Sequence, residues 1–97
     1  MTGGESGERY AGTVTAGPGG AMTDEVGVIT GDVTVVTALR PDGRAVVRIQ
    51  YLGAEEWYTL AGSPAALPPD GLRALHDAVV EAVRHGGGAV VPGSGPR

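Results

Sequence analysis

The sequence contains no cysteine, no lysine and no phenylalanine, and its aromatic residues are one tryptophan and three tyrosines. Without cysteine there is no disulfide scaffold, no thiolate metal site and no thiol nucleophile. No apolar run approaches the roughly 20 residues that span a membrane. The first residues are polar and acidic, unlike a secretory signal peptide. We therefore expect a soluble, cytoplasmic protein that has no membrane partner.

The chain is acidic, with 7 basic residues, 11 acidic residues and a net charge of −4. Binding of duplex nucleic acid draws much of its affinity from cations that neutralise phosphates, so the composition disfavours that partner. At 97 residues the chain is long enough for one small domain at most.

Glycine is concentrated at the two ends of the chain, where its large ordering entropy opposes folding. We predict that residues 1–24 form a flexible Gly-rich arm, residues 25–88 form the domain, and residues 89–97 form a short tail. Within the arm, Tyr10–Thr15 is compatible with an edge strand that its small residues weaken. The runs Gly17–Gly20 and Gly86–Gly88 are interpreted as flexible linkers.

The centre of the chain predicts a β-hairpin. Asp32–Leu39 is rich in β-branched residues, and the next five residues, Arg40–Arg44, have the pattern of a three-residue loop that ends in a glycine bulge. This loop pairs Arg40 with Arg44 and thereby sets the register. One face then carries Val33, Val35, Thr37 and Leu39 with Tyr51, Ile49, Val47 and Ala45. The other face carries Thr34, Val36 and Ala38 with Gln50, Arg48 and Val46.

Two further strands are expected around this hairpin. Glu25–Thr30 is a candidate strand before it, and Trp57–Ala61 follows a second turn. If Leu52 lies opposite Trp57, then Tyr58 and Leu60 join the face that carries Ile49, and Trp57 and Thr59 lie on the opposite face.

A helix is predicted to follow, with Asp70 as a capping or first-turn residue and Gly86–Gly88 as its end. Leu72, Leu75, Val79, Ala82 and Val83 recur at helical spacing and form one apolar stripe. The expected fold is α+β, an antiparallel β-meander of three to four strands followed by one C-terminal helix on one face. This order of elements resembles many small α+β modules, including dimeric single-strand-binding transcriptional cofactors, and the resemblance carries no motif residues.

One helix covers only one face of a sheet, and the ordered core of about 60 residues buries little apolar surface. The opposite face would expose several large apolar side chains. We therefore expect a second layer from a second copy, a partner protein or the arm. The first hypothesis is a non-catalytic interaction or self-associating module, a homodimer or the binder of a partner protein. Its predicted contact residues are Val36, Val46, Arg48, Gln50, Leu52 and Trp57.

The alternative hypothesis is single-stranded nucleic-acid binding on the same face. Arginines beside an exposed aromatic residue are the means by which several sheet modules hold unpaired bases. The residues in this interpretation are Arg40, Arg44, Arg48 and Trp57. The acidic net charge, the acidic residues in both flanking turns and the absence of a second aromatic residue beside Trp57 argue against it.

His76 and a polar face of the helix are the remaining candidates for chemistry. His76 has the residue type of a general base, which makes a small enzyme the third hypothesis, but a histidine beside an apolar stripe is more commonly a packing residue. Asp77, Glu81 and His85 share one helical face and are suitable metal-ligand types, although solvated helix faces often have this pattern. We expect no catalytic residue, no metal and no cofactor.

Overall fold

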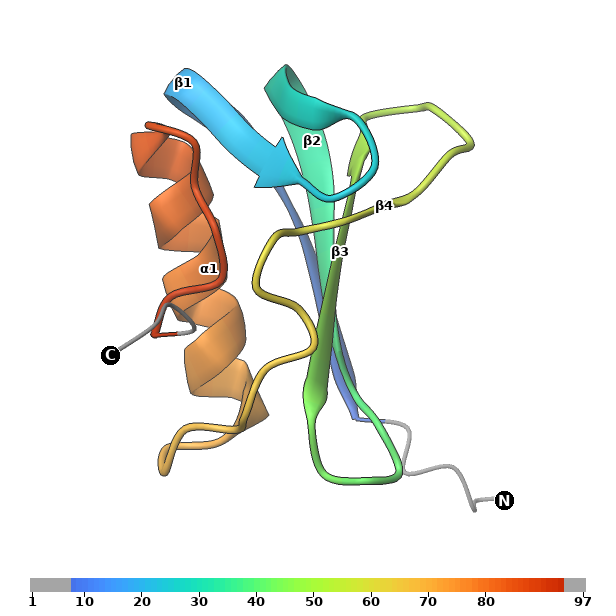
Figure 1. Ribbon diagram of the computed structural model, residues 1–97, viewed down its shortest axis with the longest axis vertical. Helices are drawn as coiled ribbons and strands as arrows, with labels where there is room; N and C mark the ends of the chain where they lie inside the picture. The colour runs from blue at the N-terminus through green and yellow to red at the C-terminus, as the bar shows by residue number, and fades with distance from the viewer. Residues whose placement is uncertain (1–7, 94–97) are drawn as a thin grey trace.

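The computed structural model describes residues 8–93, which form a four-stranded antiparallel sheet and one helix (Figure 1). The strands lie in the order β1-β2-β3-β4, so the sheet is a meander. Within the described part of the chain, no helix is long and apolar enough to cross a membrane. The predicted α+β meander with a C-terminal helix is confirmed. Its elements are β1 (Arg9–Thr23), β2 (Gly27–Leu39), β3 (Ala45–Tyr51), β4 (Tyr58–Thr59) and α1 (Leu72–His85).

The central hairpin has the predicted turn and the predicted register. The Arg40 amide donates to the Arg44 carbonyl at 2.8 Å, and the Gly43 amide donates to the Arg40 carbonyl at 2.9 Å. Gly43 has a φ of 88°, the left-handed conformation that the bulge requires. Arg48 lies opposite Val36 and is exposed, whereas its neighbour Ile49 is fully buried.

The register of β4 differs by two residues from the predicted one. Tyr58 lies opposite Ile49, whereas the pairing of Leu52 with Trp57 would place it opposite Tyr51. The second turn begins earlier than expected, since the Ala54 amide already donates to the Tyr51 carbonyl at 2.9 Å. Because a shift of two residues keeps every side chain on its face, Tyr58 still packs against the core.

Strand β1 corrects the prediction that residues 1–24 form a flexible arm. Arg9–Thr23 pairs along β2, and residues 1–7 lie outside the described residues. The side chains of Tyr10, Val14 and Ala16 pack against the core formed by the other elements. The prediction rested on the entropy that glycine loses on ordering, which disfavours folding of this segment. It did not include the hydrogen bonds and the burial that β2 and the core supply to β1. The alternative, an edge strand at Tyr10–Thr15, is confirmed.

A glycine-rich bulge divides β1 into two halves. Ala16 lies opposite Gly31 and Ala21 lies opposite Ile29, so five steps along β1 match only two along β2. Because this difference of three is odd, the positions that face the core change from even to odd numbers. Before the bulge the even-numbered residues Val14 and Ala16 face the core. After it the odd-numbered Ala21 faces the core and is fully buried.

The same bulge binds the segment that follows the helix. The Gly87 amide donates to the Pro18 carbonyl at 2.6 Å, and the Ala89 amide donates to the Gly20 carbonyl at 2.9 Å. Farther along, the Met22 amide donates to the Ala89 carbonyl at 2.8 Å. We call Gly17–Gly20 and Gly86–Ala89 together the glycine clasp. Its two runs are structural, so their interpretation as flexible linkers is wrong.

Glycine is required in the clasp because the two backbones are in direct contact. A Cβ atom added to Gly17 would collide with the Arg84 carbonyl oxygen and lie 2.5 Å from that of His85. A Cβ atom added to Gly86 would collide with the Pro18 carbonyl oxygen and lie 2.5 Å from that of Gly17. Any larger residue at Gly17 or Gly86 would therefore force the clasp apart.

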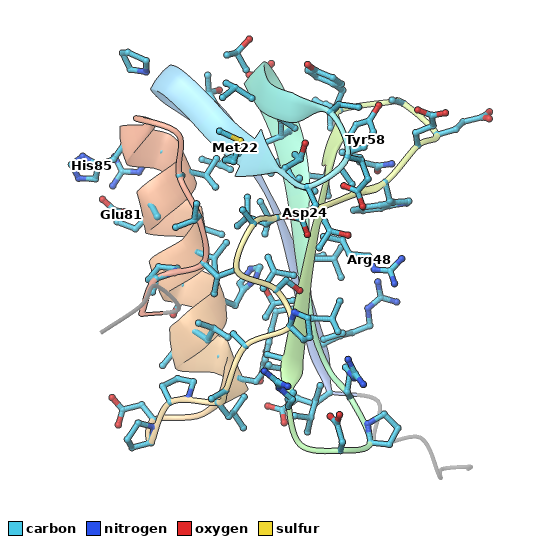
Figure 2. The ribbon with its side chains drawn as sticks, viewed as in Figure 1. Met22, Asp24, Arg48, Tyr58, Glu81 and His85 are labelled. Atoms are coloured by element: carbon cyan, nitrogen blue, oxygen red, sulfur yellow. The ribbon has the colours of Figure 1, made fainter. Side chains whose placement is uncertain are left out.

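The second half of β1 also reaches β4. The Asp24 amide donates to the Thr59 carbonyl at 3.0 Å, and the Ala61 amide donates to the Met22 carbonyl at 2.9 Å. Figure 2 shows Met22 and Asp24 at this end of β1, beside the segment that contains Tyr58. The sheet therefore curls around its core, and the backbone edge of β4 is covered there.

Helix α1 packs its apolar side against one face of the sheet (Figure 1). We call this the inner face and the opposite one the outer face. Its N-cap is Gly71 and makes no side-chain hydrogen bond, so Asp70 does not have the predicted capping role. The reason is a turn in which the Gly71 amide donates to the Pro68 carbonyl at 2.9 Å and delays the helix by one residue. The buried helical residues are Leu72, Leu75, His76, Val79 and Val83.

Candidate docking groove on the outer sheet face

The outer face of the sheet, turned away from α1, has an apolar centre. Val36, Ala38 and Val46 alternate with inward residues along the hairpin and therefore project from this face. Val36 is only 9% exposed although it lies on the outer face. Trp57, immediately before β4, is 40% exposed. The outer face thus combines an apolar floor with an accessible aromatic ring.

These side chains line a groove of about 450 Å³ that is open to solvent. It extends from the hairpin loop at Arg40 and Pro41 across the sheet to Trp57. Its lining includes three arginines and no acidic residue. The lining residues are Arg9, Val36, Ala38, Leu39, Arg40, Pro41, Val46, Arg48 and Trp57.

Carboxylates lie near the rim of the groove, outside its lining. Arg40 is 3.0 Å from the carboxylate of Asp42, and both side chains are close to half exposed. Glu25 accepts hydrogen bonds of 2.7 Å from the amide and the hydroxyl of Thr59. These bonds, with a smaller contribution from Arg48, hold the pKa of Glu25 below its ordinary value. The Arg48 side chain projects away from the helix (Figure 2), and its guanidinium makes no hydrogen bond or ion pair within residues 8–93.

Four of the six predicted contact residues line the groove: Val36, Val46, Arg48 and Trp57. Gln50 does not, because its amide nitrogen donates to the Ala54 carbonyl at 3.0 Å and holds the second turn. Leu52 is 56% exposed but lines a separate hollow near the first half of β1.

Of the residues in the nucleic-acid interpretation, Arg40, Arg48 and Trp57 line the groove and Arg44 does not. The Arg44 guanidinium instead donates to the Pro64 carbonyl at 3.4 Å. Sequence reasoning missed Arg9, since that residue fell within the arm that we expected to be flexible. The only available signal was the edge-strand character of the residues that follow it.

His76 lies between α1 and the sheet. Its side chain is 7% exposed, and its Nδ1 is 2.9 Å from the Thr37 hydroxyl oxygen. The ring of Tyr10 lies 5.8 Å away between centroids. Burial lowers the pKa of His76 below its ordinary value of 6.5, while Asp77 acts in the opposite direction and Arg73 in the same one. The neutral ring thus serves as a buried hydrogen-bond partner.

The polar side of the helix is an ion-paired surface. Glu81 accepts hydrogen bonds of 2.5 and 2.6 Å from Arg84, which hold the pKa of Glu81 below its ordinary value. Asp77 pairs with Arg73 at 3.9 Å. Figure 2 shows Glu81 and His85 pointing away from the sheet, so no second element supplies ligands. In residues 8–93, no group of three or more acidic or histidine side chains is arranged to hold a metal ion.

Comparisons of the chain with family models, with curated proteins and with solved structures found no match. The function must therefore be inferred from the groove itself.

Proposed function

We propose that this protein is a non-catalytic interaction module that binds a partner protein in the outer-face groove. The observation that carries the proposal is the open groove in which Trp57 and three arginines surround an apolar floor. Tryptophan and arginine dominate the binding energy of many protein interfaces, especially where they border well-packed apolar pockets. Trp57 and Arg48 are accordingly the expected anchors.

The charge of the groove indicates the chemistry of its partner. Arg9, Arg40 and Arg48 line it without an acidic residue between them. A partner segment that offers carboxylates around one large apolar side chain would match the guanidinium groups and fill the floor beside Trp57. The proposed partner is therefore an acidic protein segment with an apolar anchor.

A random peptide library selected against the intact protein tests this proposal. We expect enriched peptides to contain acidic residues around an apolar residue and to change the fluorescence of Trp57, the only tryptophan. Trp57→Ala and Arg48→Ala should each weaken binding by about tenfold or more. Because Trp57→Ala removes the fluorescent residue, its binding is measured with a labelled peptide. The matched controls are Leu52→Ala and Arg44→Ala, which remove exposed residues outside the groove and should change affinity less than about twofold. Failure to enrich such peptides, or equal sensitivity of the controls, would refute the proposal.

A second candidate is single-stranded nucleic-acid binding, which the meeting of Arg40, Arg48 and Trp57 in one groove supports. The carboxylates of Asp42 and Glu25 beside that groove argue against it, because they oppose phosphate groups. Titration with labelled oligo(dT) at several salt concentrations distinguishes the candidates. Salt-dependent binding that is lost in Arg48→Ala and Trp57→Ala would favour the nucleic acid, and absence of binding would remove this candidate.

A further inference from the structure

The first half of β1 has a free backbone edge. The Glu8 carbonyl accepts from the Leu39 amide at 3.0 Å, which shows that even-numbered residues of this half direct their backbone groups toward β2. In an antiparallel ladder, alternate residues direct their groups to the other side. The amides and carbonyls of Arg9, Ala11, Thr13 and Thr15 therefore point away from the sheet. Within residues 8–93, no backbone hydrogen bond reaches that edge.

This edge lacks the features that usually block strand pairing. From Arg9 to Ala16 it contains no proline and no bulge, and its only charged residue is Arg9. A hollow of about 520 Å³ borders it, lined by Thr13 and Thr15 of the strand with Val80 and Arg84 of the helix. The opposite edge differs, because β4 is covered at Thr59 by the end of β1.

We propose that the β1 edge pairs antiparallel with the β1 edge of a second copy, which makes the protein a two-fold symmetric homodimer. The two four-stranded sheets would then form one continuous sheet. The register that uses all outward backbone groups places Arg9 opposite Thr15 and Ala11 opposite Thr13. Gly12 then lies on the two-fold axis. Arg9 belongs both to this edge and to the lining of the groove, but the free backbone groups that carry the dimer proposal do not depend on the function proposed for the groove.

Charge complementarity favours a second copy over another occupant. The Thr15 hydroxyl donates to the Asp32 carboxylate at 2.6 Å, and the two residues lie side by side on β1 and β2. In the proposed register Arg9 points along the row that contains Thr15 and Asp32 of the partner subunit. The Cα atoms of this row span two strand spacings, or about 10 Å, which an arginine and an aspartate can bridge. Neither Arg9 nor Asp32 forms an ion pair within the described residues. Because the dimer is two-fold symmetric, the proposed pair between Arg9 and the partner subunit's Asp32 would form twice.

The inner face of the joint is also complementary. Tyr10 would face Val14 of the partner subunit, and both side chains are half-buried in the single chain. Aromatic and β-branched residues are favourable cross-strand pairs. Gly12 faces its own copy and places no side chain on the axis. The joint therefore adds apolar contacts beneath its backbone hydrogen bonds.

Analytical ultracentrifugation over a range of protein concentrations tests the dimer. We expect the unmodified chain to dimerise and Thr13→Pro to remain monomeric, because proline removes an outward N–H and no hydrogen bond within the sheet. Circular dichroism of Thr13→Pro verifies that the fold is kept. Trp57→Ala should leave the dimer unchanged. A monomer at every concentration would overturn the proposal, even if the edge bound an extended peptide instead.

Charge exchange tests the register without proline. Arg9→Glu and Asp32→Arg should each weaken dimerisation about fivefold or more, since each places like charges together twice. The double variant should recover most of the affinity. Arg44→Glu is the control, because it reverses a charge on the hairpin away from this edge. Single reversals that have no effect, or a double variant that is no better than the singles, would overturn the proposed pairing.

Discussion

Alanine substitutions in the glycine clasp separate the effect of backbone conformation from the effect of close contact. Gly87 has a φ of 72° and open space around its Cα, so Gly87→Ala introduces only conformational strain. Gly17 has an ordinary φ and direct contact with the helix end, so Gly17→Ala introduces only overlap. Gly86 has both, with a φ of 85° and contact with the bulge.

The expected losses of unfolding free energy follow from these differences. Gly87→Ala should lose about 1–2 kcal/mol, the usual penalty for a side chain in the left-handed region. Gly17→Ala should lose about 1–3 kcal/mol through overpacking, because its neighbours are backbone atoms that cannot rotate away. Gly86→Ala should lose about 2–5 kcal/mol, which is a large part of the stability of a small domain.

Urea denaturation followed by tryptophan fluorescence and far-ultraviolet circular dichroism measures these values. Trp57 lies outside the clasp, so its signal reports unfolding of the whole sheet. The expected order of destabilisation is Gly86→Ala, then Gly17→Ala and Gly87→Ala. If Gly17→Ala were neutral and Gly86→Ala no worse than Gly87→Ala, the direct contact between the two glycine runs would be refuted.

Three further predictions concern the core, the buried histidine and the helix cap. In thermal or urea unfolding, Val47→Ala should lower the free energy of unfolding by about 2 kcal/mol, because Val47 is fully buried. Val46→Ala on the outer face should lower it by under about 1 kcal/mol. Equal losses would contradict the hairpin register. Because burial lowers the pKa of His76, the unfolded chain binds a proton more readily, so stability should decrease as pH falls below 6.5. His76→Gln should flatten this dependence in melting curves between pH 5 and pH 7, and an unchanged slope would disprove the assignment. Asp70→Ala should change stability by less than about 0.5 kcal/mol, since Asp70 forms no cap; a loss near 1 kcal/mol would restore the predicted role.

The candidate site was predictable wherever local rules determine which way a side chain points. The loop Arg40–Arg44 sets the hairpin register, and the register places Val36, Val46 and Arg48 on the outer face. The register of the hairpin does not specify how the second turn folds. In that turn the Gln50 side chain donates to the Ala54 carbonyl, so Gln50 does not line the groove. Arg9 entered the groove only because β1 pairs with β2, a contact between segments far apart in the chain.

The sequence by itself determined the hairpin, the helix and the face on which each of their residues lies, because turn chemistry and hydrophobic periodicity act over a few neighbouring residues. Only the tertiary structure decided the role of the glycine-rich ends. Glycine is penalised when a segment is considered alone, since it loses the most backbone entropy on ordering. In the folded protein Gly17 and Gly86 are the residues that let a strand bulge and a helix end touch. The contact that offsets this entropy is formed by two segments nearly seventy positions apart, and no local pattern records it.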